Sequence, residues 1–253
     1  MLKFDTGQTT LEYLDISDEF FAGLIERIRQ HTRTLKSGVE SAWSLYQSIE
    51  YIVRAGVPGD IVECGVWSGG SMLLAAHALI HFGDTSRRIF LYDTFAGMPR
   101  PDLLDARWDG VPALPTWEHY QRNGRRWCYG GGPNHVRQVV SSSGYPEDKL
   151  VFVEGKVEDT LPTTRPETIS LLRLDTDFFR STYHELLHLY PLLSAGGILI
   201  VDDYGAFQGA RIATDLYIAE HRLPLFLSRI DASVRLAVKP PPLPGCPARP
   251  GSP

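Results

Sequence analysis

The chain has 253 residues with 43% apolar and 22% charged side chains, a composition that fits one large globular domain or at most two small ones. No run of residues is long and apolar enough to span a membrane, and the net charge of −5 argues against nucleic acid as the main partner. Three cysteines are too few and too scattered for a disulfide framework or a zinc site.

Residues 1–55 are predicted to form a helical cover ahead of the first strand. Apolar side chains over residues 20–28 repeat at the spacing of one helix face, and Ser17 is a possible cap. A second helix is predicted over residues 41–55 and ends before Gly56. The first residues lack the basic and apolar regions of a signal peptide, so we expect a cytoplasmic protein.

The stretch GDIVECGVWSGGSMLLAAHAL predicts a buried parallel strand over residues 61–66, a glycine turn, and an apolar helix over residues 71–79. In such a turn, Gly65, Gly69 and Gly70 let the backbone approach a ligand closely, and the following helix presents free N–H groups. The spacing differs from the dinucleotide fingerprint G-x-G-x-x-G. Close packing of the chain would explain the same glycines.

The next two strands are predicted over residues 87–92 and 150–153. The first of them ends at Asp93, the position at which nucleotide-binding α/β folds hold ribose hydroxyls, although a helix cap would use an aspartate in the same way. The turn at residues 155–158 would reach the same edge of the sheet, where adenine is often contacted.

Residues 97–148 lie between these two strands and are rich in glycine and proline, with several tryptophans and tyrosines. A stretch of this length is usually functional or disordered, and the aromatic side chains argue against disorder. Two interpretations stay open: a lid or acceptor-binding insertion, or a satellite hydrophobic core.

A strand, helix and strand are predicted over residues 169–174, 182–193 and 198–201. Because such a crossover makes the two strands parallel, their carboxyl ends open at the same edge of the sheet, where these folds bind ligands. The acidic residues that follow the two strands are Asp175, Asp177, Asp202 and Asp203. Four carboxylates in one crevice repel unless they are neutralised, and a hard cation such as magnesium is the usual partner. Turn formation and helix capping are the alternative roles for these residues.

The chain continues with a predicted helix over residues 206–221 and a pair of strands over residues 225–230 and 233–238. The predicted fold is therefore a doubly wound, mostly parallel α/β sheet of seven strands that ends in an antiparallel hairpin, a Rossmann-like arrangement. We expect residues 56–240 to form this domain, and the proline-rich residues 241–253 to be disordered.

Five stretches occur in order between residues 56 and 222: IVECGVWSGGS, LYDTFAGMP, EGKVEDTLP, LLRLDTD and GGILIVDDYGAFQGAR. Together they resemble the macrocin O-methyltransferase (TylF-like) family, which methylates sugar hydroxyls on macrolide, aminocoumarin and similar natural products. The resemblance implies S-adenosylmethionine as the methyl donor, a bound magnesium ion and a small glycoside acceptor. We also expect a homo-oligomer.

The same resemblance assigns roles to individual residues. Asp177 matches the position of the general base, and the metal ligands match Asp175, Asp202 and Asp203. The residues that the resemblance assigns to the methyl donor are Glu63, Cys64, Gly65, Val66, Trp67, Ser71, Asp93, Gly155, Lys156, Val157, Glu158 and Asp175. The segments 33–43 and 108–129 are less similar to the family, so the acceptor is not identified.

Two other functions stay open from the residues alone. Clustered aspartates at strand ends also serve magnesium-dependent hydrolases and phosphotransferases, although the chain has no G-x-x-x-x-G-K-[ST] motif. A non-catalytic nucleotide-binding module would use the same acidic edge for helix caps.

Overall fold

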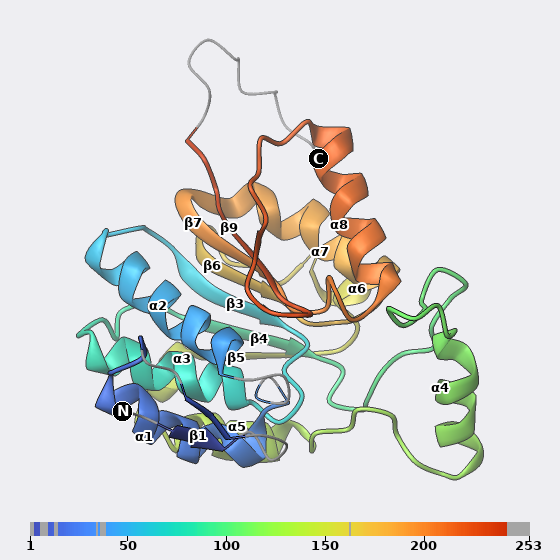
Figure 1. Cartoon of the computed structure of the whole chain (residues 1–253), viewed down its shortest axis with the longest axis horizontal. Coiled ribbons are helices and arrows are strands. Elements are labelled where there is room, and N and C mark those ends of the chain that lie inside the picture. Colours follow the sequence, from blue (N-terminus) through green and yellow to red (C-terminus); the bar gives the residue numbers. More distant parts are fainter. Residues whose placement is uncertain are drawn as a thin grey trace.

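The protein is described here by a computed structural model, which covers residues 3–5, 10–12, 15–33, 35, 39–161 and 163–241, with the backbone alone for the first two segments. The seven strands of the main sheet are β3 (Asp60–Cys64), β4 (Ile89–Asp93), β5 (Leu150–Glu154), β6 (Ile169–Leu174), β7 (Leu193–Val201), β8 (Ser228–Arg229) and β9 (Arg235–Val238). Their order across the sheet is β5-β4-β3-β6-β7-β9-β8 (Figure 1). The first five are parallel, and β9 runs antiparallel to both β7 and β8. The predicted fold class is confirmed.

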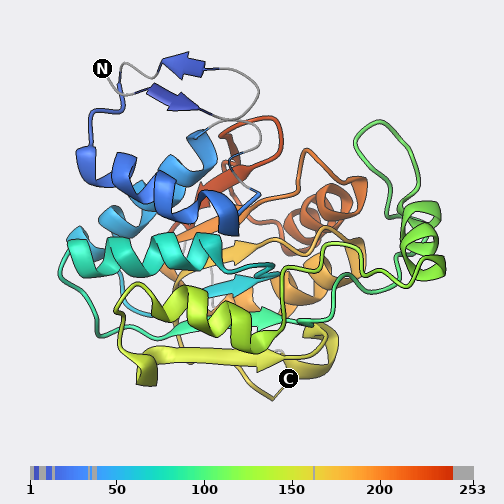
Figure 2. The ribbon, with the colours of Figure 1, turned by 90° about the horizontal axis from the view of Figure 1, so that it is seen from below.

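Helices cover both faces of the sheet (Figures 1 and 2). One face carries α1 (Glu19–Ile28), α2 (Glu40–Arg54), α3 (Gly70–His81) and α5 (Pro133–Ser141), and the other carries α6 (Val157–Thr160), α7 (Phe179–Leu189) and α8 (Gln208–His221). Each layer of helices forms its own hydrophobic cluster with the sheet. Strand β6 is buried on both faces, and all six of its residues are buried, which explains why four of them are leucine or isoleucine. Short 3₁₀ turns occur at Arg29–His31, Glu147–Lys149 and Tyr190–Leu192.

The segment before β3 contains the two predicted helices, and both pack on the same face as α3. The helix cap differs from the prediction: Asp18, rather than Ser17, accepts the backbone N–H of Phe21 at 2.9 Å. The chain ahead of α1 also forms a two-stranded antiparallel ladder of β1 (Lys3–Asp5) and β2 (Thr10–Glu12), which the sequence did not predict. Apart from residue 241, the tail predicted to be disordered lies outside the described residues.

The long stretch between β4 and β5 divides into two parts. Helix α5 buries Val136, Val139 and Val140 in the hydrophobic cluster beneath the sheet, so it belongs to the main domain. Helix α4 (Ala113–Arg122) buries only Ala113 and stands away from the rest of the molecule (Figures 1 and 2). The stretch predicted as an insertion, residues 97–148, thus contains one helix that packs on the sheet and one that stands away from it.

Asp18 joins α1 to α2 because its second oxygen accepts the hydroxyl of Tyr46 at 2.8 Å. We expect Asp18→Ala to lower the free energy of unfolding by about 1–2 kcal/mol, since it removes a helix cap and leaves a buried hydroxyl without its acceptor. Urea denaturation measures this. Asp18→Asn keeps a capping oxygen and serves as the control; an equal loss in both variants would show that the cap contributes little.

Candidate active site

A cavity of about 390 Å³ opens at the carboxyl ends of the parallel strands, where β3 and β6 lie side by side and the strand order reverses. The acidic residues Asp177, Asp202 and Asp203 line it. Of the residues assigned to the methyl donor, the cavity is lined by Gly65, Val66, Trp67, Ser71, Asp93, Gly155, Lys156, Val157, Glu158 and Asp175. Glu63 and Cys64 do not line it, because both are buried within β3.

The glycine turn after β3 is packed against its neighbours. Gly65 has φ of +84°, and a Cβ atom there would lie 2.0 Å from the carbonyl oxygen of Asp175. A Cβ atom on Gly70 would lie 2.3 Å from the carbonyl oxygen of His31. Close packing therefore does explain these glycines, and the same packing presses the turn against the end of β6.

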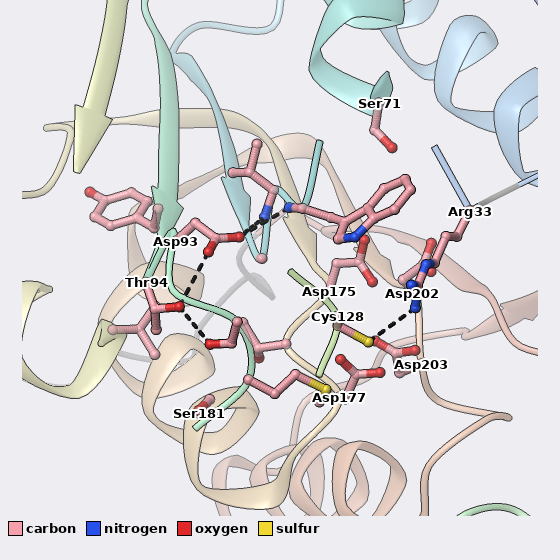
Figure 3. A pocket seen from close by; sticks show the side chains of 18 of the residues that line it. Arg33, Ser71, Asp93, Thr94, Cys128, Asp175, Asp177, Ser181, Asp202 and Asp203 are labelled. Carbon is pink, nitrogen blue, oxygen red and sulfur yellow. Dashed lines mark hydrogen bonds between the residues drawn. The ribbon is translucent and has the colours of Figure 1, made fainter. Parts of the chain in front are cut away.

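Asp93 holds the glycine turn against β4 (Figure 3). Its Oδ2 accepts the backbone N–H groups of Val66 at 2.7 Å and Trp67 at 3.0 Å, and its Oδ1 accepts that of Phe95 at 2.7 Å. Burial raises the pKa of this carboxyl, whereas the three backbone bonds oppose the shift. The side chain thus shapes the cavity wall and also faces into the cavity.

Arg173 is the buried cation beneath the acidic cluster, and the sequence analysis missed it. Its Nη1 donates to Glu63 Oε1 and to Asp175 Oδ2, both at 2.6 Å, and its Nη2 donates to Asp202 Oδ1. Burial raises the pKa of Glu63 to about 8 and the pKa of Asp175 and Asp202 to about 7, although Arg173 opposes each shift. The chain therefore supplies part of the positive charge that we had assigned wholly to a metal ion.

The oxygen atoms of Asp175, Asp202 and Asp203 offer a set of ligands for a cation. One oxygen from each lies within 4.8 Å of the other two. Asp203 Oδ2 is buried and has no hydrogen-bond partner among the described residues. Burial and the neighbouring carboxyls of Asp177 and Asp202 raise the pKa of Asp203 well above its usual range. Because hard divalent cations take carboxylate oxygens, these residues fit magnesium.

Asp177 lies beside this cluster, close to Asp203 and Cys128 (Figure 3). Its φ of +65° is uncommon for a residue other than glycine. Burial raises the pKa of Asp177 well above its usual range, and nearby Cys128 and Asp175 add to the shift. The carboxyl group is therefore held, at a cost in backbone strain, beside the candidate metal ligands.

Glu185 is a second residue that the sequence analysis missed, and it is acidic. It lies on α7 and is completely buried. Its Oε2 accepts the hydroxyl of Thr176 at 3.1 Å, while its Oε1 has no partner among the described residues. Burial raises the pKa of Glu185 to about 8, and Thr176 opposes the shift.

Residues outside those assigned to the methyl donor and the metal also line the cavity. Arg33, from the segment after α1, donates to the Cys128 sulfur at 3.0 Å and lies 4.7 Å above the Trp67 ring. These contacts join residues far apart in the chain, and loops have no periodic sequence pattern from which such contacts could be predicted. Further residues that line the cavity include His31, Thr32, Arg33, Ser41, Met98, Cys128, Ser181, Asp231, Ser233 and Val234.

The sequence was compared with models of known protein families. The family model described as Macrocin-O-methyltransferase (TylF) matches residues 37–236. The chain belongs to this family. A tetracenomycin 4'-O-methyltransferase of Streptomyces olivaceus, which acts on the 8-demethyl-8-(2,3-dimethoxy-alpha-L-rhamnosyl) compound, is 32% identical over 78% of this chain and 72% of its own. The demethyldecarbamoylnovobiocin O-methyltransferase of Streptomyces niveus is 31% identical over 77% of this chain and 71% of its own.

Solved structures agree with this assignment. The O-methyltransferase NovP superposes with a TM-score of 0.72 at 29% identity, covering 83% of each chain. A calicheamicin methyltransferase covers 93% of this chain and 96% of its own with a TM-score of 0.62, and at 19% identity it supports the fold alone. The macrocin-O-methyltransferase family member described here is thus an O-methyltransferase, as predicted, rather than a hydrolase or a binding module. None of the helices in the described ranges has the length and apolar character needed to cross a membrane.

We expect Asp93→Ala to weaken S-adenosylmethionine binding by about 10- to 100-fold, because the backbone of the glycine turn loses its acceptor along with any ribose contact. Calorimetry without metal measures the dissociation constant. Asp84→Ala is a suitable control, since Asp84 accepts the Ser86 N–H at 3.0 Å in a loop that does not line the cavity. Wild-type affinity of Asp93→Ala would remove Asp93 from the binding site.

The raised pKa of Glu185 predicts how the free energy of unfolding changes with pH. Its folded pKa of about 8 lies above its usual value of 4.5, so the folded state holds a proton that the unfolded state releases. The contribution of neutral Glu185 is full below about pH 4.5, decreases as pH rises, and is lost above about pH 8. Relative to wild type, Glu185→Gln should therefore gain about 2–5 kcal/mol across this range. Denaturation at a series of pH values measures the difference; the exposed Glu154→Gln should show no such trend.

Proposed function

We propose that this enzyme transfers the methyl group of S-adenosylmethionine to a sugar hydroxyl of a glycosylated natural product, with magnesium bound beside the acceptor. The observation that carries the proposal is that one cavity brings the glycine turn and Asp93 together with the cluster of Asp175, Asp202 and Asp203. The proposed binding site for the methyl donor and the set of oxygen ligands thus line one cavity, and they are joined where Gly65 packs against the backbone of Asp175.

The half of the cavity near β3, β4 and β5 suits the methyl donor. Asp93 presents a carboxylate at the end of β4, where ribose hydroxyls are held in related folds. The turn after β5 brings Lys156 and Val157 to the same edge, and Glu158 is fixed there because its Oε1 accepts the Ser181 hydroxyl at 2.9 Å. S-adenosylmethionine, when bound, supplies a reactive methyl group on a sulfonium ion.

The half of the cavity near β6 and β7 suits an acceptor hydroxyl and a cation. Asp175, Asp202 and Asp203 would hold magnesium. Asp203 Oδ2 accepts no hydrogen bond from the described residues, so its lone pairs are available to the cation. Magnesium, when bound, acts as a Lewis acid that lowers the pKa of a nearby hydroxyl and neutralises the carboxylates. Arg173 meanwhile fixes the orientation of Asp175 and Asp202 through one oxygen of each.

Asp177 would accept the proton of the acceptor hydroxyl. A sugar hydroxyl is a weak nucleophile at neutral pH, so it has to lose its proton as it attacks the methyl group. Asp177 stands two residues beyond Asp175 and lines the same cavity, with its carboxyl group near that of Asp203 (Figure 3). A raised pKa makes this carboxylate a stronger base than an exposed aspartate.

The acceptor class rests on the relatives. Their names include a rhamnosyl tetracenomycin 4'-O-methyltransferase and the mycinamicin III 3''-O-methyltransferase of Micromonospora griseorubida, which is 31% identical over 77% of this chain. We infer a glycoside acceptor for this enzyme too. Mass spectrometry of a panel of glycosides incubated with the enzyme and S-adenosylmethionine tests it, and methylation confined to sugar-free phenols would contradict it. The homo-oligomer and the cytoplasmic location stay predictions.

Removing the metal ion with a chelator and adding it back tests whether methyl transfer depends on it. We expect EDTA to abolish methyl transfer and magnesium to restore it. Asp203→Ala should need far more magnesium or remain inactive, because it removes the one ligand that has a free buried oxygen among the described residues. Isothermal titration measures the magnesium affinity, with the exposed Asp148→Ala as control. Full activity in EDTA would reject the metal.

Proton removal is tested at the neighbouring residue. Asp177→Asn keeps the size of the side chain, so it should retain magnesium and methyl-donor binding while turnover falls about 10²–10⁴-fold. Single-turnover kinetics together with both binding constants measure this. If the variant loses magnesium as Asp203→Ala does, Asp177 is a ligand; if it turns over at the wild-type rate, it is not the base.

A further inference from the structure

The backbone turn that carries Asp177 is strained. Asp177 has φ of +65°, and the N–H of Phe178 donates to the carbonyl of Thr176 at 2.7 Å. A hydrogen bond from residue i+2 to residue i with a positive φ at the central residue defines the rarer of the two γ-turn types, which is strained. Such a turn persists only where the surrounding structure holds it in place.

Contacts on both sides fix the ends of the turn. Before it, the N–H of Asp175 donates to the carbonyl of Cys64 at 2.8 Å, as part of the pairing between β3 and β6. After it, the N–H of Phe179 donates to Asp105 Oδ1 at 2.8 Å. Between these anchors, the buried ring of Phe178 packs against Trp127 and Phe207, with 6.0 Å between ring centroids in each pair. The side-chain hydrogen bond within the turn runs from Thr176 Oγ1 to Glu185 Oε2 at 3.1 Å.

Glu185 has no evident role as an ion-pair partner. It is completely buried, and its Oε1 has no hydrogen-bond partner among the described residues. The charged side chains that affect its pKa are the acids Glu158 and Asp175, which raise it further. A buried carboxyl group that is only half satisfied destabilises the fold. Glu185 does not line the cavity, and its hydrogen bond with Thr176, which does line it, connects it to the site.

We propose that Glu185 is a positioning residue for methyl transfer: by holding the Thr176 hydroxyl it fixes the strained turn that aims Asp177 at the acceptor. This rests on the proposed function, in which Asp177 accepts the proton. Loss of the bond lets the turn relax and moves the Asp177 carboxylate, while Asp93 and the rest of the methyl-donor site stay as they are. A displacement of this kind lowers turnover without weakening the binding of the methyl donor.

The test replaces each partner with a side chain of similar size that cannot make the bond. In both Glu185→Leu and Thr176→Val, we expect kcat to fall about 10- to 100-fold while the dissociation constant for S-adenosylmethionine stays within about threefold. Glu185→Gln and Thr176→Ser keep the bond and should restore most of the turnover. Thr214→Val is the matched control: Thr214 is completely buried, and its hydroxyl donates to the Ala210 carbonyl at 2.8 Å in α8, away from the cavity.

The double variant Glu185→Leu with Thr176→Val should be no slower than the slower single variant, because both changes remove the same interaction. Thr176→Val also covers the case in which Glu185→Leu does not fold. The inference is overturned if both single variants fold and keep wild-type kcat, if kcat and methyl-donor affinity fall together, or if Glu185→Gln is as slow as Glu185→Leu. Wild-type kcat in these variants while Asp177→Asn is inactive would reject this inference alone; an active Asp177→Asn would reject the proposed base as well.

Discussion

The pairing of Arg173 with three carboxylates is the interaction on which the site depends. Its guanidinium reaches Glu63 in β3, Asp175 after β6 and Asp202 after β7, so one buried side chain ties together three neighbouring strands at the reversal of strand order. Removing one partner of such a network leaves uncompensated charge in the interior, which is strongly destabilising. The arginine thus lets acids be concentrated where the fold opens to ligands.

One guanidinium does not balance the whole cluster. Asp203 adds a further carboxyl, and burial raises the pKa of Asp175, Asp202 and Asp203, which favours their protonated forms. Protons and a divalent cation are alternative ways of balancing the same carboxyls. Metal binding and proton release are therefore coupled at this site, as they are wherever ligands have to be deprotonated.

The elements that the sequence predicted well are those whose burial imposes a clear pattern. Strand β6 was placed to the residue, over 169–174, because it is mostly apolar and buried on both faces. Strand β8 was predicted over 225–230 but spans only Ser228–Arg229, because apolar Phe226 is 83% exposed and the pattern there does not record burial. Helix α4 was missed for a related reason: with only Ala113 buried, it has no apolar face to read.

In the site, topology was predictable and side-chain contacts were not. That Asp93, Asp175 and Asp202 meet at one edge follows from parallel strands alone. Arg173 could have been predicted as a buried ion-pair partner, since it is the single charged residue in a mostly apolar strand. The burial of Glu185 could also have been predicted, because it stands on the buried face of α7 with Thr182, Leu186 and Leu189. The bond between Arg33 and Cys128 joins residues 95 positions apart, and no local pattern encodes it.

The contact of Gly65 with the carbonyl of Asp175 has a consequence for how such enzymes diversify. Because the two loops touch through their backbones, the spacing between the glycine turn and the acidic cluster is set by main-chain geometry rather than by side chains that substitutions can alter. The segments around Arg33, Cys128 and α4 lie outside this contact. Substitutions at Arg33 and Cys128 can therefore reshape the cavity wall without changing how the turn after β3 packs against the end of β6.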